Sequence, residues 1–184
     1  MSLVKSFKRS RLFYGFINLA FNSYDSDRVK AVGADTAAAE WLVKNDGWIR
    51  AKGRSSWVKD YNSLSSCYGP SFKLAGIEAV NIDITSGGCQ HFNGLKHVRH
   101  VCVSGCVNID DKGLQIVSRN CWETLEHLDV SGTSVSIRGL EELVILRSLK
   151  TLKYDKKLKS DNAKHEAVMK QLIESNKELE IEAV

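Results

Sequence analysis

A short phrase of apolar residues recurs four times between residues 77 and 154 of this chain. Within each copy the apolar positions are spaced three and then two residues apart. A period of about 20–29 residues with this spelling is typical of leucine-rich repeats, in which each unit is a short strand with a helical return. The sequence therefore predicts an α/β fold, a short leucine-rich-repeat solenoid of about four repeats over residues 71–184 whose stacked units share one core. The copies are Ile77-x-x-Val80-x-Ile82-x-x-Thr85, Val98-x-x-Val101-x-Val103-x-x-Cys106, Leu125-x-x-Leu128-x-Val130-x-x-Thr133 and the shorter Leu149-x-x-Leu152-x-Tyr154.

The second half of each predicted repeat indicates a helical return. Asp110 and Ser136 stand where capping residues of the return helices are expected. The last helix is predicted to begin at Ser160 or Asp161 and to end near Ser175. The alternating Leu-Glu-Ile-Glu segment after it predicts a closing strand whose glutamates face water and protect the sheet edge. Such a scaffold presents a surface, which argues against an enzyme built around a pocket.

Residues 25–70 are predicted to form a helical N-terminal capping domain, because a solenoid needs its first repeat covered by a unit with a polar outer face. Asp25 or Ser26 is a candidate cap for a short helix ending at Val32, and Asp35 for a second helix over Thr36–Lys44. Three tryptophans are expected to form the core of this domain: Trp41, Trp48 and Trp57.

Residues 1–24 form a basic segment that contains no acidic residue. Apolar and aromatic side chains recur along it at helical spacing, a composition typical of mitochondrial transit peptides and of interfacial membrane helices. We interpret it as a targeting or membrane-contact segment; a helix that packs on the folded domain is the alternative, and cleavage stays open. Its basic residues are Lys5, Lys8, Arg9 and Arg11.

The net charge of +4 is confined to that segment. Four of the 26 Lys and Arg residues lie within it, so the remaining chain balances 22 basic against 22 acidic side chains. A nucleic-acid-binding protein places its excess charge on the folded surface. The sequence therefore predicts no nucleic-acid partner.

Several specific motifs resemble the ATP synthase subunit s family. They are Ala38-Ala39-Glu40-Trp41-Leu42, Trp57-Val58-Lys59-Asp60-Tyr61-Asn62, Gly94-Leu95-Lys96-His97-Val98 and Ile109-Asp110-Asp111. The likeness covers residues 12–155, with a similar short helix and strand after it. The distal membrane-arm assembly proteins of complex I share both ends of the pattern, and the stretch Trp122–Leu140 is more similar to them.

The resemblance implies a non-catalytic, peripheral protein on the matrix side of the mitochondrial inner membrane, with a four-repeat array behind a helical cap. For subunit s it implies support of proton-coupled ATP synthesis by limiting a proton leak through protein–protein contacts. For the complex I proteins it implies help in assembling the distal membrane arm. The implied partners are ATP synthase or respiratory-chain subunits.

The resemblance also implies a Mg²⁺ site. Family members bind Mg²⁺ through the loop after the Glu-Trp-Leu helix and a threonine of the first repeat; the matching residues are Asp46, beside Gly47, and Thr85. Asp46 replaces a glycine that served through its backbone carbonyl, and a carboxylate is itself a hard-oxygen ligand. Mg²⁺ keeps several waters, so two protein ligands are compatible with binding. A polar loop without a metal is the alternative.

The five cysteines are odd in number and fit no zinc spacing, which predicts free thiols in a reducing compartment. Family members carry a Cys-x-Cys dithiol in the second repeat. Here those positions are Ser104 and Cys106, so the dithiol is absent. The Cys106 thiol is predicted to be buried and structural.

The predicted strands place polar side chains on the concave face of the sheet, because residues that flank a buried position point outward. With strands about 4.8 Å apart, His100, Cys102, His127 and Asp129 are predicted to form a compact polar square. The predicted rows across the sheet are Ala79, His100, His127, Thr151; Asn81, Cys102, Asp129, Lys153; and Asp83, Ser104, Ser131, Asp155. We predict a partner-binding face made of Asn81, His100, Cys102, His127, Asp129, Lys153 and Asp155.

Three alternatives to this face stay open. The square has the residue types of a Zn²⁺ site and of a Cys-His-Asp nucleophile set, although a flat sheet offers no oxyanion hole. A further alternative is a leucine-rich-repeat adaptor of a ubiquitin ligase, because the repeats end in Cys or Thr; no F-box-like segment precedes them.

Overall fold

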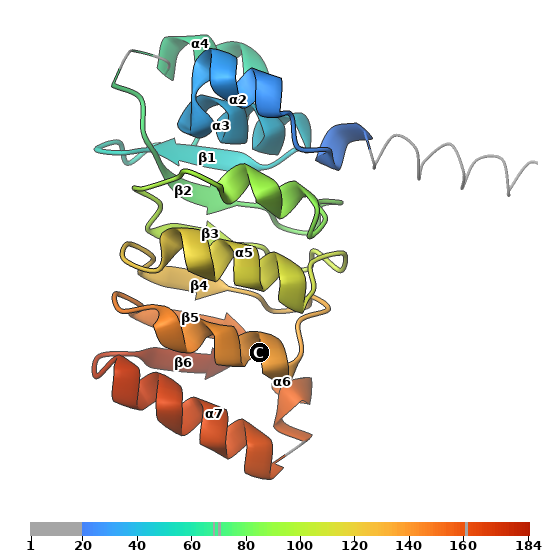
Figure 1. Cartoon of the computed structure of the whole chain (residues 1–184), viewed down its shortest axis with the longest axis vertical. Coiled ribbons are helices and arrows are strands. Elements are labelled where there is room, and N and C mark those ends of the chain that lie inside the picture. The colour runs from blue at the N-terminus through green and yellow to red at the C-terminus, as the bar shows by residue number, and fades with distance from the viewer. Residues whose placement is uncertain (1–19, 68, 70, 161) are drawn as a thin grey trace, which may run out of the picture.

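The computed structural model describes residues 20–67, 69, 71–160 and 162–184, and most of the predicted targeting segment lies outside them. Six strands form one sheet in chain order (Figure 1). The first pair is antiparallel and every later pair is parallel, so each strand lies beside the next one along the chain. This confirms the predicted α/β class. The strands are β1 (Trp48–Ala51), β2 (Leu74–Glu78), β3 (His100–Cys102), β4 (His127–Asp129), β5 (Thr151–Tyr154) and β6 (Glu180–Ala183).

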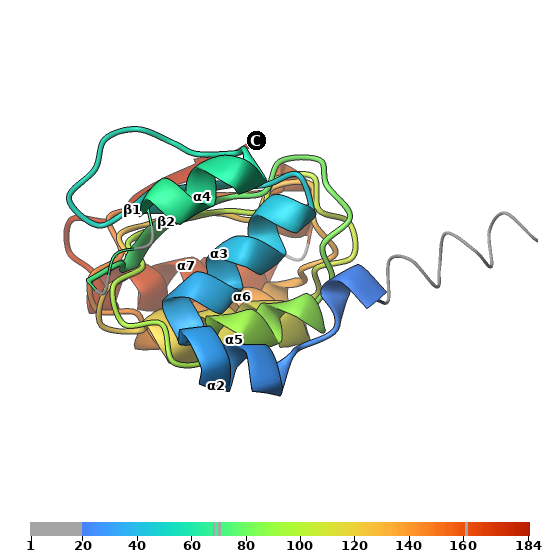
Figure 2. The same ribbon diagram turned by 90° about the horizontal axis from the view of Figure 1, so that it is seen from above.

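The connections between the parallel strands return over one face of the sheet (Figures 1 and 2). In strand order they are η1 (Gly88–Phe92), α5 (Asp111–Cys121), α6 (Ile137–Glu141) with η2 (Glu142–Ile145), and η3 (Lys156–Ser160) with α7 (Asn162–Ser175). At the β1 end lie α2 (Ser26–Val32), α3 (Ala34–Lys44) and α4 (Tyr61–Cys67). Along the described chain no return helix covers the opposite face, which we call the open face.

The core lies between the sheet and the returns. One row of it crosses the parallel strands in register, and its members are at most 2% exposed: Ile77, Val101, Leu128 and Leu152. Fully burying a side chain of this size stabilises the fold by about 1.5–3 kcal/mol. In β3, β4 and β5 the buried positions are those of the second to fourth copies of the sequence phrase.

The first copy is the exception, because its register is three residues earlier than predicted. Ile77 pairs with Val101, so the buried positions of this strand follow Leu74-x-x-Ile77-x-Ala79. Val80, predicted to be buried, is 49% exposed, whereas Ala79 is fully buried. The antiparallel pairing of β1 with residues 74–78 fixes this register. The predicted places of Ala79, Asn81 and Asp83 on the open face are therefore wrong.

Successive returns begin in a similar way, with a side-chain oxygen that accepts a backbone N–H of the first turn. Asp110 and Ser136 cap α5 and α6 as predicted. Thr85 has the same role at η1, where its Oγ1 accepts the N–H of Gly88 at 3.3 Å. Such contacts satisfy donors that a helix start leaves without a partner.

These three returns, η1, α5 and α6, are also tied to the element before them through the N–H of the capping residue. The acceptors are Asn22 Oδ1 for Thr85 (2.9 Å), Ser86 Oγ for Asp110 (2.9 Å) and Asp111 Oδ1 for Ser136 (2.7 Å). A glycine three residues after each cap permits this approach. A Cβ at Gly113, for example, would lie 2.6 Å from Ser86 Oγ.

Three details of the N-terminal region differ from the prediction. Asp35 does not cap α3; its carboxylate accepts the N–H of Leu74 at 2.9 Å and pairs with Lys73, because the chain returns there to begin β2. Trp48 is 42% exposed, and Trp57 lies on the open face, so only Trp41 belongs to the core. Asp25 caps α2 as predicted. At the other end α7 begins at Asn162, and Asp161 lies outside the described residues.

Candidate functional site

Two rows of outward-facing residues cross the open face. The pairings His100 with His127 and Cys102 with Asp129 confirm the predicted placement of the square. Lys153 continues the second row as predicted, and Glu78 takes the place that was predicted for Asn81. The first row is Arg50, Gly76, His100, His127, Thr151, Glu180, and the second is Trp48, Glu78, Cys102, Asp129, Lys153, Glu182.

Aromatic and imidazole rings follow one another along the first row. The loop after β1 brings Trp57 over Gly76, where a Cβ would lie 2.7 Å from the indole. The Trp57 ring meets the His100 ring edge to face at 5.4 Å, and the His127 ring lies 6.0 Å further on. Arg50 stacks over Trp57 at 4.8 Å, which anchors the loop. His127 Nδ1 lies 2.9 Å from Thr151 Oγ1, which fixes this ring too.

The second row carries charges of both signs. Lys153 Nζ lies 2.6 Å from Glu182 Oε2, and hydrogen bonding with this carboxylate raises the pKa of Lys153. Asp129 Oδ1 accepts the N–H and the hydroxyl of Ser131, which turns the chain at the end of β4. Glu78 Oε1 lies 3.4 Å from His100 Nε2. The row therefore offers partly exposed carboxylates and one ammonium to a partner.

Thiol chemistry is disfavoured on this face. Burial, together with the nearby carboxylates of Asp129 and Glu78, raises the pKa of Cys102 to about 11. Burial also lowers the pKa of His100. A reactive cysteine needs a lowered pKa, and the pKa of Cys102 is raised although Lys153 lies nearby. Within the described ranges no group of three His, Cys, Asp or Glu is arranged to hold a metal ion.

The two other predicted partner residues lie at the end of the strands. Asn81 adopts a left-handed φ of +53°, in line with Gly105 at +73° and Gly132 at +65° in the next two units. Asn81 donates its N–H to Ser104, which continues the parallel pairing beyond β2. Asp155 accepts the N–H and the ammonium of Lys157, and these contacts lower its pKa. Asn81 thus lies beside the open face, outside its two rows.

The implied Mg²⁺ ligands have the right atoms but few of them. Asp46 is exposed and adopts φ of +64°, a conformation that favours glycine. Gly47 is buried, because a Cβ there would lie 2.6 Å from Leu42. The Thr85 hydroxyl accepts the N–H of Gly88, which leaves it one further lone pair. Asp46 and Thr85 offer hard oxygen atoms, and water would have to fill the remaining positions around Mg²⁺.

The cysteines that the structure describes are free thiols: Cys89, Cys102, Cys106 and Cys121. Cys106 is fully buried as predicted, and its thiol donates to the carbonyl of Ala79 at 3.1 Å. Burial raises the pKa of Cys89 and of Cys121 to about 12. These three thiols fill the core.

Sequence reasoning missed the residues that complete the open face: Arg50, Trp57 and Glu78. Trp57 and Arg50 come from the segment that was assigned to the cap, and only the chain path brings them across the sheet. Gly76 was the available signal, because a glycine in a row of larger side chains leaves a space that another residue fills. Glu78 was missed because the first strand was predicted in a register three residues too late.

No family model matches the chain. Curated relatives do match it over most of its length. The chain is 36% identical to "ATP synthase subunit s, mitochondrial" of Pongo abelii over 146 residues, which are 78% of this chain and 73% of that protein. It is 35% identical to the protein of the same name from Homo sapiens over 148 residues, 79% of this chain and 72% of that protein.

A weaker match is "Distal membrane arm assembly component 2" of Drosophila melanogaster, 24% identical over 130 residues, which are 68% of this chain and 46% of that protein. In the part of the chain that the structure describes, no helix has the length and apolar character that crossing a membrane requires. The identity to the first group, over more than two thirds of both chains, shows that the chain belongs to the ATP synthase subunit s family.

Proposed function

We propose that this chain is a non-catalytic protein of the mitochondrial inner membrane that binds subunits of ATP synthase through the open face. The observation that carries the proposal is the open face itself, a sheet surface with two rows of partly exposed polar side chains and no return helix over it among the described residues. The names of the relatives supply the complex.

The chemistry of the face supports a binding role over a catalytic one. The raised pKa of Cys102 keeps its thiol protonated at neutral pH. The space above the square is small, about 140 Å³, whereas pockets for small ligands usually measure about 300–1,000 Å³. A shallow face lined by rings and charges is better matched to another protein surface.

The finer architecture that we propose is a leucine-rich-repeat array behind an N-terminal cap formed by residues 25–70. Three findings support it: the one-strand, one-return order, the buried positions of the phrase in β3 to β5, and the similar starts of η1, α5 and α6. An array of this kind offers an extended surface to one partner.

We further propose that the protein sits on the matrix side of the inner membrane and limits proton leak by bracing the subunits that it contacts. In this account residues 1–24 direct it to the mitochondrion or to the membrane surface. The mitochondrial names of the relatives support the location, and the basic, acid-free sequence of the segment supports its role.

Affinity purification of the full chain from mitochondria, with mass spectrometry of the co-purifying subunits, tests this function. We expect ATP synthase subunits to co-purify with the protein and to remain bound during a wash at moderate salt. Depletion of the protein should also speed the decay of the membrane potential when ATP synthase turnover is blocked. Recovery without any ATP synthase subunit, or an unchanged decay, would contradict the proposal.

Assembly of the complex I distal membrane arm is the second candidate function, and one observation favours it. The weaker relative is named for the assembly of a distal membrane arm. The same purification separates the two candidates. If the second candidate is right, the co-purifying subunits belong to the complex I membrane arm. Depletion of the protein should then also leave newly made complex I as an incomplete subassembly.

A further inference from the structure

The charge of the folded part of the chain is balanced overall but is sorted along the strand direction. The segments beside the starts of the parallel strands hold eight Lys or Arg and three Glu: residues 52–54, 71–73, 93–99, 122–126, 146–150 and 176–179. The segments beside their ends hold five Asp and two Lys: residues 45–47, 80–87, 104–111, 131–136 and 155–157. One edge of the sheet is therefore basic and the opposite edge acidic.

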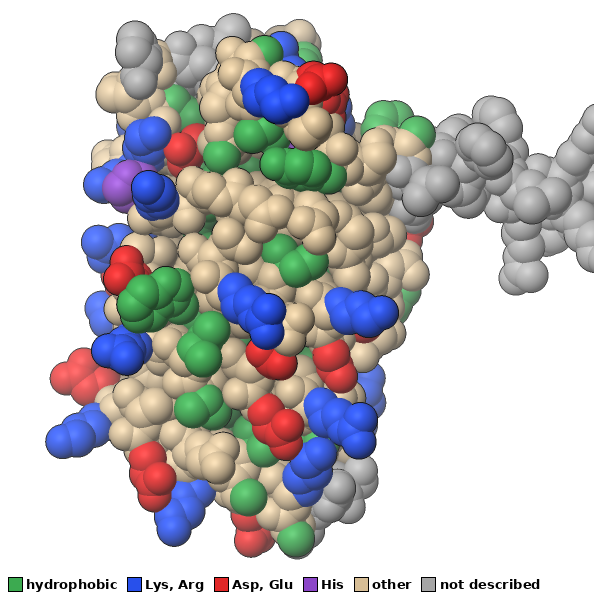
Figure 3. All heavy atoms as spheres, in the orientation of Figure 1, with side chains coloured by type: hydrophobic (Ala, Val, Ile, Leu, Met, Phe, Trp, Pro, Cys, Tyr) green, Lys and Arg blue, Asp and Glu red, His purple; other side chains and the backbone are tan. Residues whose placement is uncertain are grey.

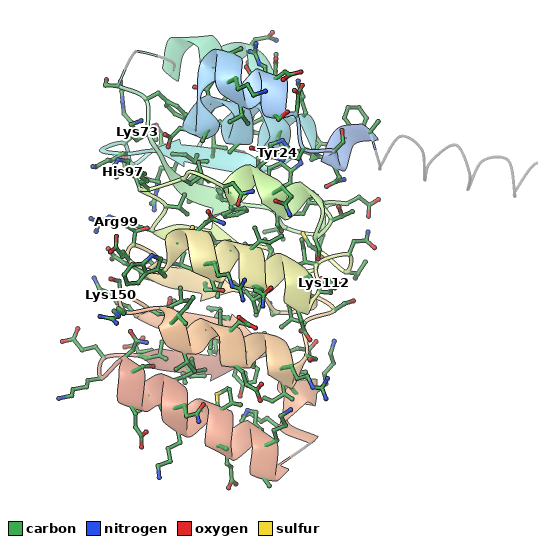
Figure 4. The ribbon with its side chains drawn as sticks, in the orientation of Figure 1. Tyr24, Lys73, His97, Arg99, Lys112 and Lys150 are labelled. Atoms are coloured by element: carbon green, nitrogen blue, oxygen red, sulfur yellow. The ribbon has the colours of Figure 1, made fainter. Side chains whose placement is uncertain are left out.

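The cations of the strand-start edge, which we call the basic edge, lie in a line (Figure 3). Figure 4 places Lys73, His97, Arg99 and Lys150 along it, and Lys112 well away from it. Six strands about 4.8 Å apart give this line a length of about 24 Å. Its members are Lys52, Arg54, Lys73, Lys96, Arg99, Arg147, Lys150 and Lys177.

One of the three glutamates of this edge, Glu126, lies beneath its cations, whereas Glu123 and Glu178 are exposed. Glu126 pairs with both Arg99 and Lys150, and only 16% of its side chain is exposed, against 62% and 54% for the two cations. Asp35 pairs with Lys73 and is 13% exposed. The outer charge of the edge is therefore predominantly positive, because eight cations stand against the exposed carboxylates of Glu123 and Glu178. Five further cations of the edge have no carboxylate partner among the described residues: Lys52, Arg54, Lys96, Arg147 and Lys177.

A large amphipathic ring sits among these cations. Trp122 is 39% exposed, and the Arg147 guanidinium lies over it at 5.6 Å. Two hollows flank Lys96. One, of about 400 Å³, is lined by Lys73, Lys96, His97 and the start of α3, which has no side-chain cap and carries Asp35, the partner of Lys73. The other, of about 340 Å³, is lined by Lys96, Arg119, Trp122 and the carboxylate of Glu123. Cations and free N–H groups of a helix start attract phosphate.

We propose that the basic edge lies against an anionic phospholipid bilayer, with headgroup phosphates at the two hollows beside Lys96. A straight basic line matches a planar anionic surface, and tryptophan with Lys and Arg is the residue set found at membrane interfaces. This deepens the membrane placement proposed above and assigns the contact to the folded domain. The described chain begins on the opposite side, at Ala20, so residues 1–19 and the edge are separable by mutation.

Co-flotation of the full chain with vesicles tests the proposal. Wild-type protein should float with vesicles of phosphatidylcholine mixed with phosphatidylglycerol, and not with phosphatidylcholine alone. Neutralising three edge cations, in Lys52→Gln with Lys96→Gln and Arg147→Gln, should weaken the partition about a hundredfold, at about fivefold for each cation. The matched control removes three exposed cations from other surfaces: Lys112→Gln, Arg138→Gln and Lys156→Gln.

Equal losses in the edge and control variants would show a net-charge effect and overturn the proposal. The proposal would also be overturned if the edge variant bound vesicles as well as wild type does, and binding were lost only when Lys5, Lys8, Arg9 and Arg11 are changed to Gln. Retention on RNA or on an acidic peptide that depends on the edge, with unchanged flotation, would assign the edge to another partner. Vesicles contain no ATP synthase, so failure here leaves the proposed role of the open face standing.

Tryptophan fluorescence gives a second readout. Brominated phosphatidylglycerol in the vesicles should quench part of the emission, and Trp122→Phe should remove that part. Trp48→Phe is the matched control, because Trp48 is 42% exposed but belongs to β1 and the open face. Quenching that disappears with Trp48 and persists without Trp122 would contradict the proposed orientation.

Discussion

Asn22 Oδ1 accepts the backbone N–H of Thr85 at 2.9 Å, the contact that Ser86 and Asp111 make with the next two returns. Asn22 precedes the first strand by more than twenty residues, yet it makes with η1 the contact that Ser86 makes with α5 and Asp111 makes with α6. The regular array of contacts thereby extends beyond the returns that connect the parallel strands. The segment that contains Asn22 covers the end of the core where α3 and η1 meet.

Asn22→Ala should destabilise the fold by about 1–3 kcal/mol, because the N–H of Thr85 and the carbonyl of Asp83 lose partly buried hydrogen bonds together. Asn22 Nδ2 also donates to the carbonyl of Asp83 at 2.9 Å, and the residue is 4% exposed. Urea denaturation measures the change. Asn108→Ala is the control, because Asn108 makes an exposed contact with the same Asp83; an equal effect of the two changes would refute this role.

Leu128→Ala should cost about 2–5 kcal/mol, because it opens a cavity in the row of core residues that crosses the parallel strands. Leu128 is 2% exposed and pairs in register with Val101 and Leu152. Thermal and urea melts report the loss. Ile145→Ala removes an aliphatic side chain that is 43% exposed and should cost far less. If Leu128→Ala lowers the free energy of unfolding by less than about 1 kcal/mol, the effect is smaller than expected for truncating a core residue, and this row is not the core.

The Cys102 thiol should react slowly with a disulfide reagent at neutral pH and faster as the pH approaches 11. Its raised pKa leaves little thiolate at pH 7, because burial and the carboxylates of Asp129 and Glu78 oppose the negative charge. The labelling rate of Cys102 is obtained by subtracting the thiol labelling of Cys102→Ser from that of wild type. Rapid labelling at pH 7 that is lost in this variant would revive the nucleophile hypothesis.

Mg²⁺ should raise the melting temperature slightly if Asp46 and Thr85 retain the family's site, because an ion that binds only the folded state stabilises it. Asp46→Ala should abolish the shift, because it removes the carboxylate ligand. Ca²⁺ and an EDTA-treated sample are the comparisons. No shift in wild type at millimolar Mg²⁺ would show that the replacement of the glycine has removed the site.

The strands that could be predicted from sequence were those with strong apolar neighbours. Val98, Val101 and Val103, and the equivalent residues of β4 and β5, alternate with polar residues, so they have one consistent register. The first strand allows two overlapping phrases. The sequence favoured Val80 over Ala79, because a small buried alanine contributes less to the pattern than an exposed valine.

The square of the open face could be predicted because it depends only on the register of β3 and β4. Trp57 and the Asn22 contact could not, because both depend on where a loop or a terminal segment crosses the sheet. The basic edge could not be predicted either, because its residues are spread over six segments of the chain. The net charge of the chain does not show how the charges are distributed between the two edges of the sheet.

The most direct test of the central claim is co-purification of ATP synthase subunits with an open-face variant. Asp129→Lys with Lys153→Glu reverses both charges of adjacent residues on β4 and β5. Lys170→Glu with Glu174→Lys makes the same exchange on the exposed pair of α7 and serves as the control. We predict that the open-face variant loses the ATP synthase subunits while the control retains them, and that both variants still unfold cooperatively in a thermal melt. Normal recovery of the subunits by a folded open-face variant would contradict the account.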